Sequence, residues 1–159
     1  MRLQILFLYL CKKTGMINRI IKGSILSDYK RRKVIVLLGA RQVGKTTLLS
    51  ELCEGKDRVL SLNCDNVDDV LALEGKTTTE LRQLLSSYEL VFIDEAQRVK
   101  NVGLTLKMIG DLKLETQVVV TGSSSLDMAD EINEPATGRL IEYNLFPFSL
   151  PELALYSSE

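Results

Sequence analysis

A glycine-rich stretch at residues 37–49 carries the strongest chemical signal in this sequence. It reads LLGARQVGKTTLL and has the spacing Gly-x-x-x-x-Gly-Lys-Thr across residues 39–46. Gly39 and Gly44 permit backbone conformations that side chains block, so the N–H groups of the loop can point at phosphate. Lys45 would reach the β- and γ-phosphates of a nucleotide, and the hydroxyl of Thr46 would bind magnesium. The predicted nucleotide-binding residues are Gly39, Ala40, Arg41, Gln42, Val43, Gly44, Lys45, Thr46 and Thr47.

An acidic pair follows a second apolar stretch. The segment LVFID at residues 90–94 is typical of a strand buried on both faces, and Glu95 comes directly after it. Such a strand carries Asp94 to the carboxyl edge of a parallel sheet, beside the phosphate loop, where it would hold magnesium through water. Glu95 would polarise the attacking water as a general base. An acidic pair can also cap the next helix, but the phosphate loop upstream favours catalysis.

Hydroxyl side chains end a third apolar stretch, VVVTGSSS, at residues 118–125. One of these hydroxyls would contact the γ-phosphate or the attacking water. We predict Ser123 for this role, with Thr121 as the second choice. The alternative is that the serines only cap a helix, as Ser124 or Ser125 would do.

An arginine commonly stabilises the charge that develops on a phosphoryl group during hydrolysis. Arg139 is the candidate here, because it follows EPATG and leads into the last predicted strand. It would act within its own subunit or across an interface. Arg41 and Arg98 are alternative arginines, and an ordinary surface role remains the alternative for Arg139.

Alternating strands and helices would position these groups. Apolar β-branched runs predict strands at residues 34–39, 58–65, 90–94, 117–122 and 139–146. Helical spacing predicts helices at residues 17–29, 45–53, 67–73, 78–88 and 99–112, a short helix near 126–132, and a closing segment from residue 147. Thr77 and Glu80 have the spacing of a capping box. This order predicts an α/β fold, a three-layer sandwich around a five-stranded, mostly parallel sheet.

The composition excludes several other kinds of chemistry. The chain has 159 residues and a net charge of -1, so no overall positive field attracts nucleic acid, and nucleic-acid binding would have to rest on a local patch or another domain. It contains no histidine, which excludes histidine bases and triads, and its three cysteines have no metal-binding spacing. The apolar run at residues 3–11 is shorter than the roughly 20 residues that span a bilayer. We therefore expect a cytoplasmic protein without a membrane partner.

Four blocks together resemble the AAA+-type P-loop ATPase domain of a large family of prokaryotic ATP-binding proteins. They are LLGARQVGKTTLL, LVFIDEAQRV, VVVTGSSS and GRLIEYNLFPFSLPEL, in this order, and the resemblance runs from about residue 16 to residue 153. Ala40 stands where this family usually has proline. The resemblance implies that Gly39, Gly44, Lys45 and Thr46 form the nucleotide loop. It implies that Asp94 and Glu95 are the magnesium and hydrolysis pair. Ser123 would be the sensor residue, and Arg139 corresponds to the family's Gly-Arg position.

The resemblance also implies a domain organisation. Members of the family usually begin near the position of Met16 and continue into a further C-terminal domain, often described as nuclease-like. We therefore expect an N-terminal extension at residues 1–15, with Met16 as a possible start, and an ATPase domain at residues 16–159. The C-terminal output domain would be missing from this sequence.

Two functions fit these residues. The first is an ATPase domain that binds Mg-ATP, hydrolyses it slowly or on contact with a partner, and drives or regulates that partner or a C-terminal domain. The second is a nucleotide-dependent binding or regulatory module with little or no turnover. A GTPase or small-molecule kinase is disfavoured, because the sequence has no Asn-Lys-x-Asp guanine signature and no arginine-rich lid. The partner protein and the oligomeric state stay open.

Overall fold

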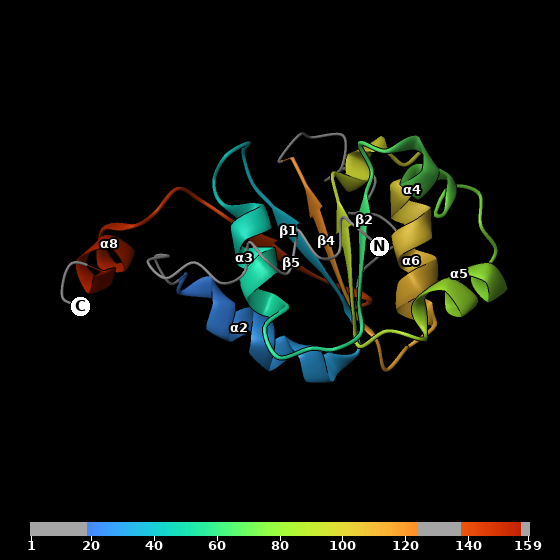
Figure 1. The fold of residues 1–159 in the computed structure, drawn as a ribbon, viewed down its shortest axis with the longest axis horizontal. Helices are drawn as coiled ribbons and strands as arrows, with labels where there is room; N and C mark the ends of the chain where they lie inside the picture. Colours follow the sequence, from blue (N-terminus) through green and yellow to red (C-terminus); the bar gives the residue numbers. More distant parts are fainter. Residues whose placement is uncertain (1–18, 124–137, 157–159) are drawn as a thin grey trace.

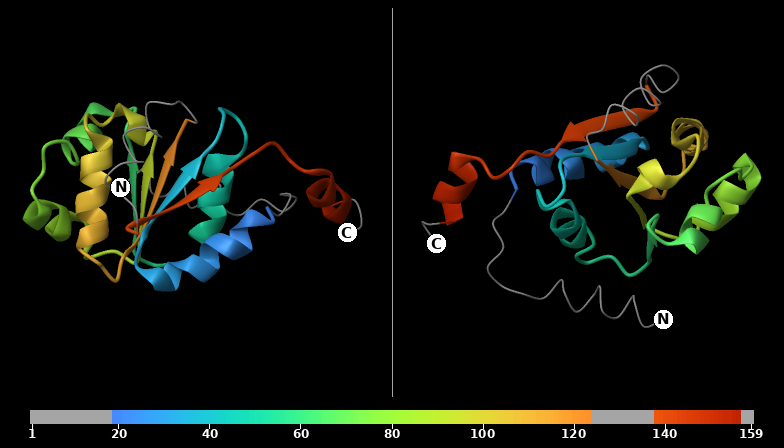
Figure 2. Two further views of the ribbon diagram at one scale, coloured as in Figure 1. Left: turned by 180° about the vertical axis from the view of Figure 1, so that it is seen from behind. Right: turned by 90° about the horizontal axis from the view of Figure 1, so that it is seen from above.

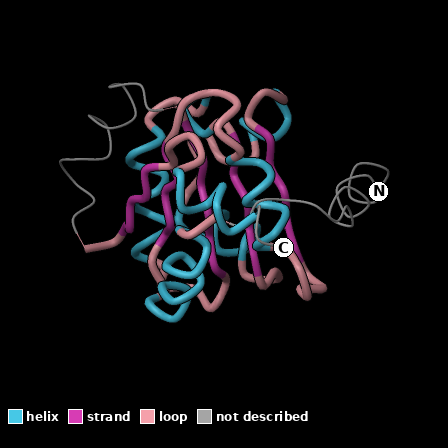
Figure 3. The backbone as a smooth tube through the Cα atoms, turned by 90° about the vertical axis from the view of Figure 1, so that its left-hand side faces the viewer, coloured by secondary structure: helices cyan, strands magenta, loops and turns pink. Residues whose placement is uncertain are grey.

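The computed structural model describes residues 19–123 and 138–156, which form a five-stranded sheet with helices on both faces. The predicted extension at residues 1–15 and the predicted short helix near residues 126–132 lie outside the described residues. The strands are β1 (Val34–Leu38), β2 (Val59–Asn63), β3 (Leu90–Asp94), β4 (Gln117–Gly122) and β5 (Leu140–Asn144). They follow the order β2-β3-β4-β1-β5, and every neighbouring pair is parallel. The predicted α/β fold is confirmed, with strands in the interior and helices outside them (Figure 3), and the sheet that was expected to be mostly parallel is parallel throughout.

This strand order fixes where a functional site can form. Because all strands run the same way, their last residues meet at one edge, the carboxyl edge, and their first residues meet at the opposite, amino edge. Strand β4 lies between β1 and β3. The strands that lead into the phosphate loop and the acidic pair are therefore two strand spacings apart, about 10 Å.

The helices cover the sheet in two layers (Figure 1). One layer holds α2 and α3, and the other holds α4, α5 and α6. The bounds are α2 (Ile21–Asp28), η1 (Tyr29–Arg31), α3 (Lys45–Leu52), α4 (Val67–Leu71), α5 (Thr78–Leu85), η2 (Ala96–Arg98), α6 (Val102–Asp111) and α8 (Leu150–Tyr156). Helix α8 stands apart from the sheet in all views (Figures 1 and 2).

Two apolar cores form because the central strands are buried on both faces. Alternate residues of β1 point to opposite sides, so that Val36 packs with α5 and α6 whereas Ile35 and Leu37 pack with α2 and α3. Strand β3 divides in the same way, with Phe92 on the α3 side. This double burial explains why continuous apolar runs predicted these strands.

Some helix ends differ from the sequence-based prediction. The first helix ends at Asp28 and continues as the 3₁₀ turn η1, and Arg32 then adopts a left-handed conformation with φ of 53°. The capping box on α5 is confirmed: Glu80 N–H donates to Thr77 Oγ1 at 3.3 Å, and Thr77 N–H donates to Glu80 Oε2 at 2.8 Å.

A buried ion pair fastens α8 to the start of the described chain. Arg19 Nε lies 3.5 Å from Glu152 Oε1, and the two side chains are 6% and 8% exposed. The backbone N–H of Ile20 donates to the same carboxylate at 3.1 Å. The guanidinium also lies 4.4 Å from the centre of the Phe148 ring. Within the described part of the chain, no helix is long and apolar enough to cross a membrane.

Candidate functional site

The phosphate loop connects β1 to α3 at the carboxyl edge. Gly44 has φ of 93° at the position before the helix, where a glycine is the least strained residue. Gln42 is also left-handed, with φ of 66°. Helix α3 begins at Lys45, so its free N–H groups and the positive end of its dipole face the loop. This is the arrangement that binds an anionic group.

Gly39 is required for a different reason from the predicted one. It lies outside the left-handed region, so conformational freedom does not explain it. A Cβ atom placed at Gly39 would lie 2.6 Å from the carbonyl oxygen of Leu145, which follows β5. The N–H of Leu145 donates to Leu38 O at 2.7 Å and holds the two backbones together. The prediction was therefore wrong about Gly39, where close backbone approach excludes a side chain.

Lys45 lies folded against its own loop. Its Nζ donates to the carbonyl oxygens of Gly39 at 2.7 Å and Ala40 at 2.9 Å, and the residue is only 7% exposed. Among the ion pairs of the described residues, none involves Lys45. A buried ammonium held by carbonyl groups alone is well suited to an anionic ligand.

A cavity of about 520 Å³ opens beside this lysine. Its lining combines the loop and the start of α3 with the residues that follow β2 and β3: Arg41, Gln42, Gly44, Lys45, Thr46, Thr47, Asp65 and Glu95. The structure thus brings six of the nine predicted loop residues together with the predicted base. Gly39, Ala40 and Val43 do not line the cavity.

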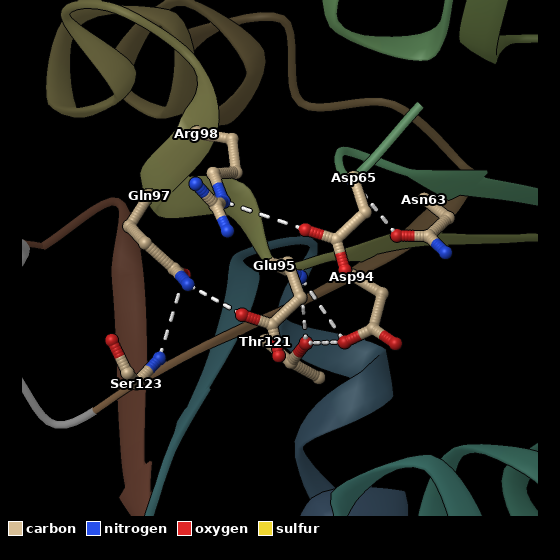
Figure 4. Close-up of polar contacts among 8 residues, drawn as sticks. All are labelled: Asn63, Asp65, Asp94, Glu95, Gln97, Arg98, Thr121 and Ser123. Carbon is tan, nitrogen blue, oxygen red and sulfur yellow. Dashed lines mark hydrogen bonds and ion pairs between the residues drawn. The ribbon is translucent and has the colours of Figure 1, made fainter. Parts of the chain in front are cut away.

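The acidic pair is held by β4 (Figure 4). The Thr121 hydroxyl donates a short hydrogen bond to Asp94 Oδ1. The N–H of Glu95 is shared between Asp94 Oδ1 at 3.1 Å and Thr121 Oγ1 at 3.3 Å. Glu95 has left-handed dihedrals, φ 54° and ψ 40°, which cost about 1–3 kcal/mol in a residue with a side chain. Glu95 lines the cavity, whereas Asp94 does not.

The two hydroxyl candidates occupy different places. Thr121 is fully buried and contacts the acidic pair directly. Ser123 lies at the end of β4, where its backbone N–H donates to Gln97 Oε1 at 3.4 Å. Thr121 therefore positions the acidic pair, while Ser123 lies close to the same group of side chains (Figure 4).

Sequence reasoning did not single out two residues at this edge, Asp65 and Gln97. Asp65 lines the cavity, and its Oδ1 pairs with Arg98 Nε at 3.4 Å. Its position just after β2 was an available signal, because Asp94 ends β3 at the same edge of the sheet. Gln97 donates to the Glu95 carboxylate from within η2, and its signal was its place in the block LVFIDEAQRV.

Arg139 is not brought to the cavity. Its carbonyl accepts the N–H of Val34 at 3.1 Å, which places it at the amino edge, and its guanidinium pairs with Asp111 at the end of α6. A Cβ added to Gly110 would lie 2.9 Å from Arg139 Cβ. The residue precedes a strand of a parallel sheet, so its chain position alone puts it at the edge opposite the phosphate loop. Of the other two arginines, Arg41 lines the cavity.

The carboxyl edge concentrates negative charge. Burial and then four nearby carboxylates raise the pKa of the Cys64 thiol to about 12: Asp69, Asp94, Asp65 and Glu95. The thiol therefore stays protonated at neutral pH and packs as a small apolar group. Such an edge suits a cation that arrives together with phosphate groups.

The donor set fits magnesium only in combination with phosphate. Of the two predicted ligands, Thr46 lines the cavity and Asp94 does not, and both would offer the hard oxygen atoms that Mg²⁺ prefers. Residues 19–123 and 138–156 contain no group of three histidine, cysteine or acidic side chains that could hold a metal ion. Mg²⁺ is usually held by one or two carboxylates together with substrate phosphates and water, so two protein oxygens are a sufficient protein share.

Comparison with known proteins agrees with this geometry. The profile of a family described as AAA domain matches residues 31–154, and the chain belongs to this family. No curated protein matches the sequence. Among solved structures, a DNA replication initiation factor is similar over 85% of this chain and 48% of its own, with 20% identity and a TM-score of 0.51. The ORC1 protein of Aeropyrum pernix, solved in complex with DNA, is similar over 85% of this chain and 46% of its own, with 16% identity and a TM-score of 0.54.

These structures share the fold, and this chain spans about half the length of each. The strand order β2-β3-β4-β1-β5 and the family match together define the chain as an AAA-type domain with the P-loop NTPase fold.

Proposed function

We propose that this domain binds Mg-ATP and hydrolyses it. The observation that carries the proposal is the cavity in which the phosphate loop, the buried Lys45 ammonium and Glu95 meet. Exchange of the two carbonyl partners of Lys45 for β- and γ-phosphate oxygens would replace weak acceptors with charged ones. ATP is preferred over GTP because the sequence has no guanine signature.

The residues at this edge would divide the work. The loop N–H groups and Lys45 would hold the phosphates, while Thr46 and Asp94 would hold Mg²⁺, which supplies positive charge to the phosphate oxygens. Glu95 would accept a proton from the attacking water. Thr121 would keep the acidic pair in place through its contacts with Asp94 and the Glu95 backbone. Ser123 would contact the γ-phosphate or the attacking water. Arg139, at the opposite edge, would act only across an interface between copies.

We further propose that the nucleotide state drives or regulates a protein partner or a C-terminal domain in the cytoplasm. The two similar structures are about twice as long as this chain, and one was solved with DNA. The four sequence blocks favour the prokaryotic branch with a nuclease-like C-terminal domain. The second candidate is a regulatory module with little turnover. It is favoured by the position of Lys45, whose ammonium is hydrogen-bonded to carbonyl oxygens of its own loop.

Nucleotide binding is tested with Lys45→Ala. Mg-ATP should raise the melting temperature of the wild-type protein, and this increase should disappear in the variant because the ammonium that faces the phosphates is gone. Lys100→Ala, at an exposed lysine, is the control and should keep the full increase. An undiminished increase in Lys45→Ala would refute the proposed site.

Hydrolysis is tested with Glu95→Gln. Loss of a general base lowers turnover by about 100- to 10,000-fold, while ATP-dependent stabilisation should persist. Glu54→Gln, at an exposed glutamate of the same chain, is the control. Wild-type protein that is stabilised by ATP but shows no phosphate release, alone or with its partner, would establish the regulatory module instead.

A further inference from the structure

Gln97 occupies the middle of η2, two residues after the proposed base (Figure 4). Its Nε2 donates a short hydrogen bond to Glu95 Oε2. Its Oε1 accepts the backbone N–H of Ser123 at 3.4 Å. The side chain thus bridges the end of β3 and the end of β4.

The two ends of the amide match their partners. An ionised carboxylate only accepts hydrogen bonds, whereas a backbone N–H only donates them. An amide that faces both must turn its nitrogen to Glu95 and its oxygen to Ser123, as it does here. Glutamate in its place would repel Glu95, and an aliphatic side chain would lose both contacts. The position therefore requires a side chain that donates at one end and accepts at the other, as an amide does.

The structure holds Glu95 at two separate points. Asp94 and Thr121 fix its backbone N–H, and Gln97 fixes its carboxylate. The backbone contacts alone leave the side-chain torsions of a glutamate free to rotate, and its head group lines an open cavity. Among residues 19–123 and 138–156, the hydrogen bond from Gln97 is the one contact that limits where this carboxylate points.

We propose that Gln97 is a positioning residue for hydrolysis, which holds the Glu95 carboxylate over the cavity and ties it to the end of β4. The inference rests on the proposed function of Glu95. Its consequence is that β4 supports the base twice, through Thr121 at the backbone and through Ser123 at the head group. A shift in the last residues of β4 would pass directly to the base.

The test separates catalysis from binding. Gln97→Ala should lower kcat by about 10- to 100-fold, because a base displaced by an ångström loses that much rate. The KM for ATP and the ATP-dependent melting shift should stay at wild-type values, since Gln97 does not line the cavity. Gln97→Glu keeps an acceptor for Ser123 and places a like charge beside Glu95, so its kcat should fall at least as far. Gln83→Ala, at an exposed glutamine on α5, is the matched control.

A second measurement does not depend on turnover. The side-chain amide of Gln97 gives a pair of signals in a ¹H–¹⁵N spectrum, which Gln97→Ala identifies by their loss. Glu95→Ala should move these signals toward those of exposed glutamines, whereas Glu54→Ala should leave them in place.

The outcomes are distinct. Unchanged or increased kcat in Gln97→Ala would overturn the positioning role, and so would amide signals that ignore Glu95→Ala. Failure of the proposed function has a different signature, because wild-type protein would then show neither phosphate release nor ATP-dependent stabilisation, while the amide signals would still respond to Glu95→Ala. That result would leave the bridge as a structural contact and remove its catalytic role.

Discussion

Strand β5 is packed against a glycine at each end, and the two contacts serve different regions. At the carboxyl edge, the Leu145 carbonyl lies over Gly39 beneath the phosphate loop. At the amino edge, Arg139 lies over Gly110 of α6. In both places a methyl group would collide with a neighbour, so both glycines are fixed by packing rather than by backbone conformation.

The charges around the two contacts differ. In the described part of the chain, Lys45 at the carboxyl edge has carbonyl partners alone and lines a cavity, whereas Arg139 at the amino edge is paired with Asp111. Arg32 and Glu115 form another ion pair near that edge. Tight packing alone therefore does not mark a functional site. A better marker of the functional site is a buried charge, here Lys45, that has no opposite charge beside it among the described residues.

The largest effect is expected for Gly39→Ala. The new methyl group would meet a backbone oxygen that cannot swing aside, so we expect a loss of about 1–3 kcal/mol in the free energy of unfolding and at least tenfold weaker ATP binding. Denaturant unfolding and nucleotide titration measure the two effects. Gly23→Ala is the control, because nothing lies within 4 Å of that helical position, and it should stabilise α2 by about 0.5–1 kcal/mol. Equal effects of the two variants would contradict the packing argument.

Gly110→Ala should produce a smaller effect that is confined to stability. Its nearest neighbour is the Arg139 Cβ at 2.9 Å, followed by the Arg139 carbonyl oxygen at 3.2 Å, and adjustment at the end of β5 can relieve part of the overlap. We expect a loss of about 1–2 kcal/mol with unchanged ATP affinity in the folded protein. Weakened ATP binding would show that the two ends of β5 are coupled.

Tyr143 lies on β5 between these two ends, and its pKa predicts that the stability of the protein falls at alkaline pH. Burial, a 2.6 Å hydrogen bond to Asp28 and the charge of that carboxylate raise the pKa of Tyr143 from 10.0 to about 12. Since the pKa is higher in the folded state, this contribution to stability is complete below pH 10 and is lost as the pH rises to 12. Melting temperatures across pH 8–12 should fall less steeply in Tyr143→Phe than in the wild-type protein. A parallel decline in both would exclude this group as the cause.

Arg139→Ala should have the smallest effect. Its ion pair with Asp111 is exposed by 37% and 48%, so solvent screening limits the loss to about 0–1 kcal/mol. ATP hydrolysis by dilute protein should be unchanged, because the side chain is at the edge opposite the cavity. A loss of activity that appears only as protein concentration rises would identify Arg139 as a residue that acts across an interface.

Local sequence predicted the elements whose residues are buried on both faces. The bounds of β3 and β4 agree with the predicted residues, because continuous apolar runs are required wherever helices cover a sheet on two sides. The capping box of α5 was also predictable, since both partners lie within one turn. The phosphate loop was predictable because it follows a buried strand, its residues are close in sequence, and their spacing is fixed.

Contacts between distant segments could not be predicted in this way. The requirement for Gly39 comes from Leu145, 106 residues further along the chain, and the Gln97 bridge depends on where β4 ends. The placement of Arg139 was available from topology, because a residue that precedes a parallel strand starts at the amino edge. Its position after the other motifs in the sequence suggested a role at the phosphate site, but the direction of β5 places it at the opposite edge of the sheet.

The buried pair of Arg19 and Glu152 shows that the folded domain extends beyond the residues that the family profile matches. The family profile begins at residue 31, but Glu152 inside the profile depends on an arginine outside it. A protein that starts at residue 31 would lose the cation and the backbone N–H that hold Glu152, and with them helix α2, whose Ile25 is fully buried in the core. The boundary that homology draws would therefore be a poor place to cut this domain for expression.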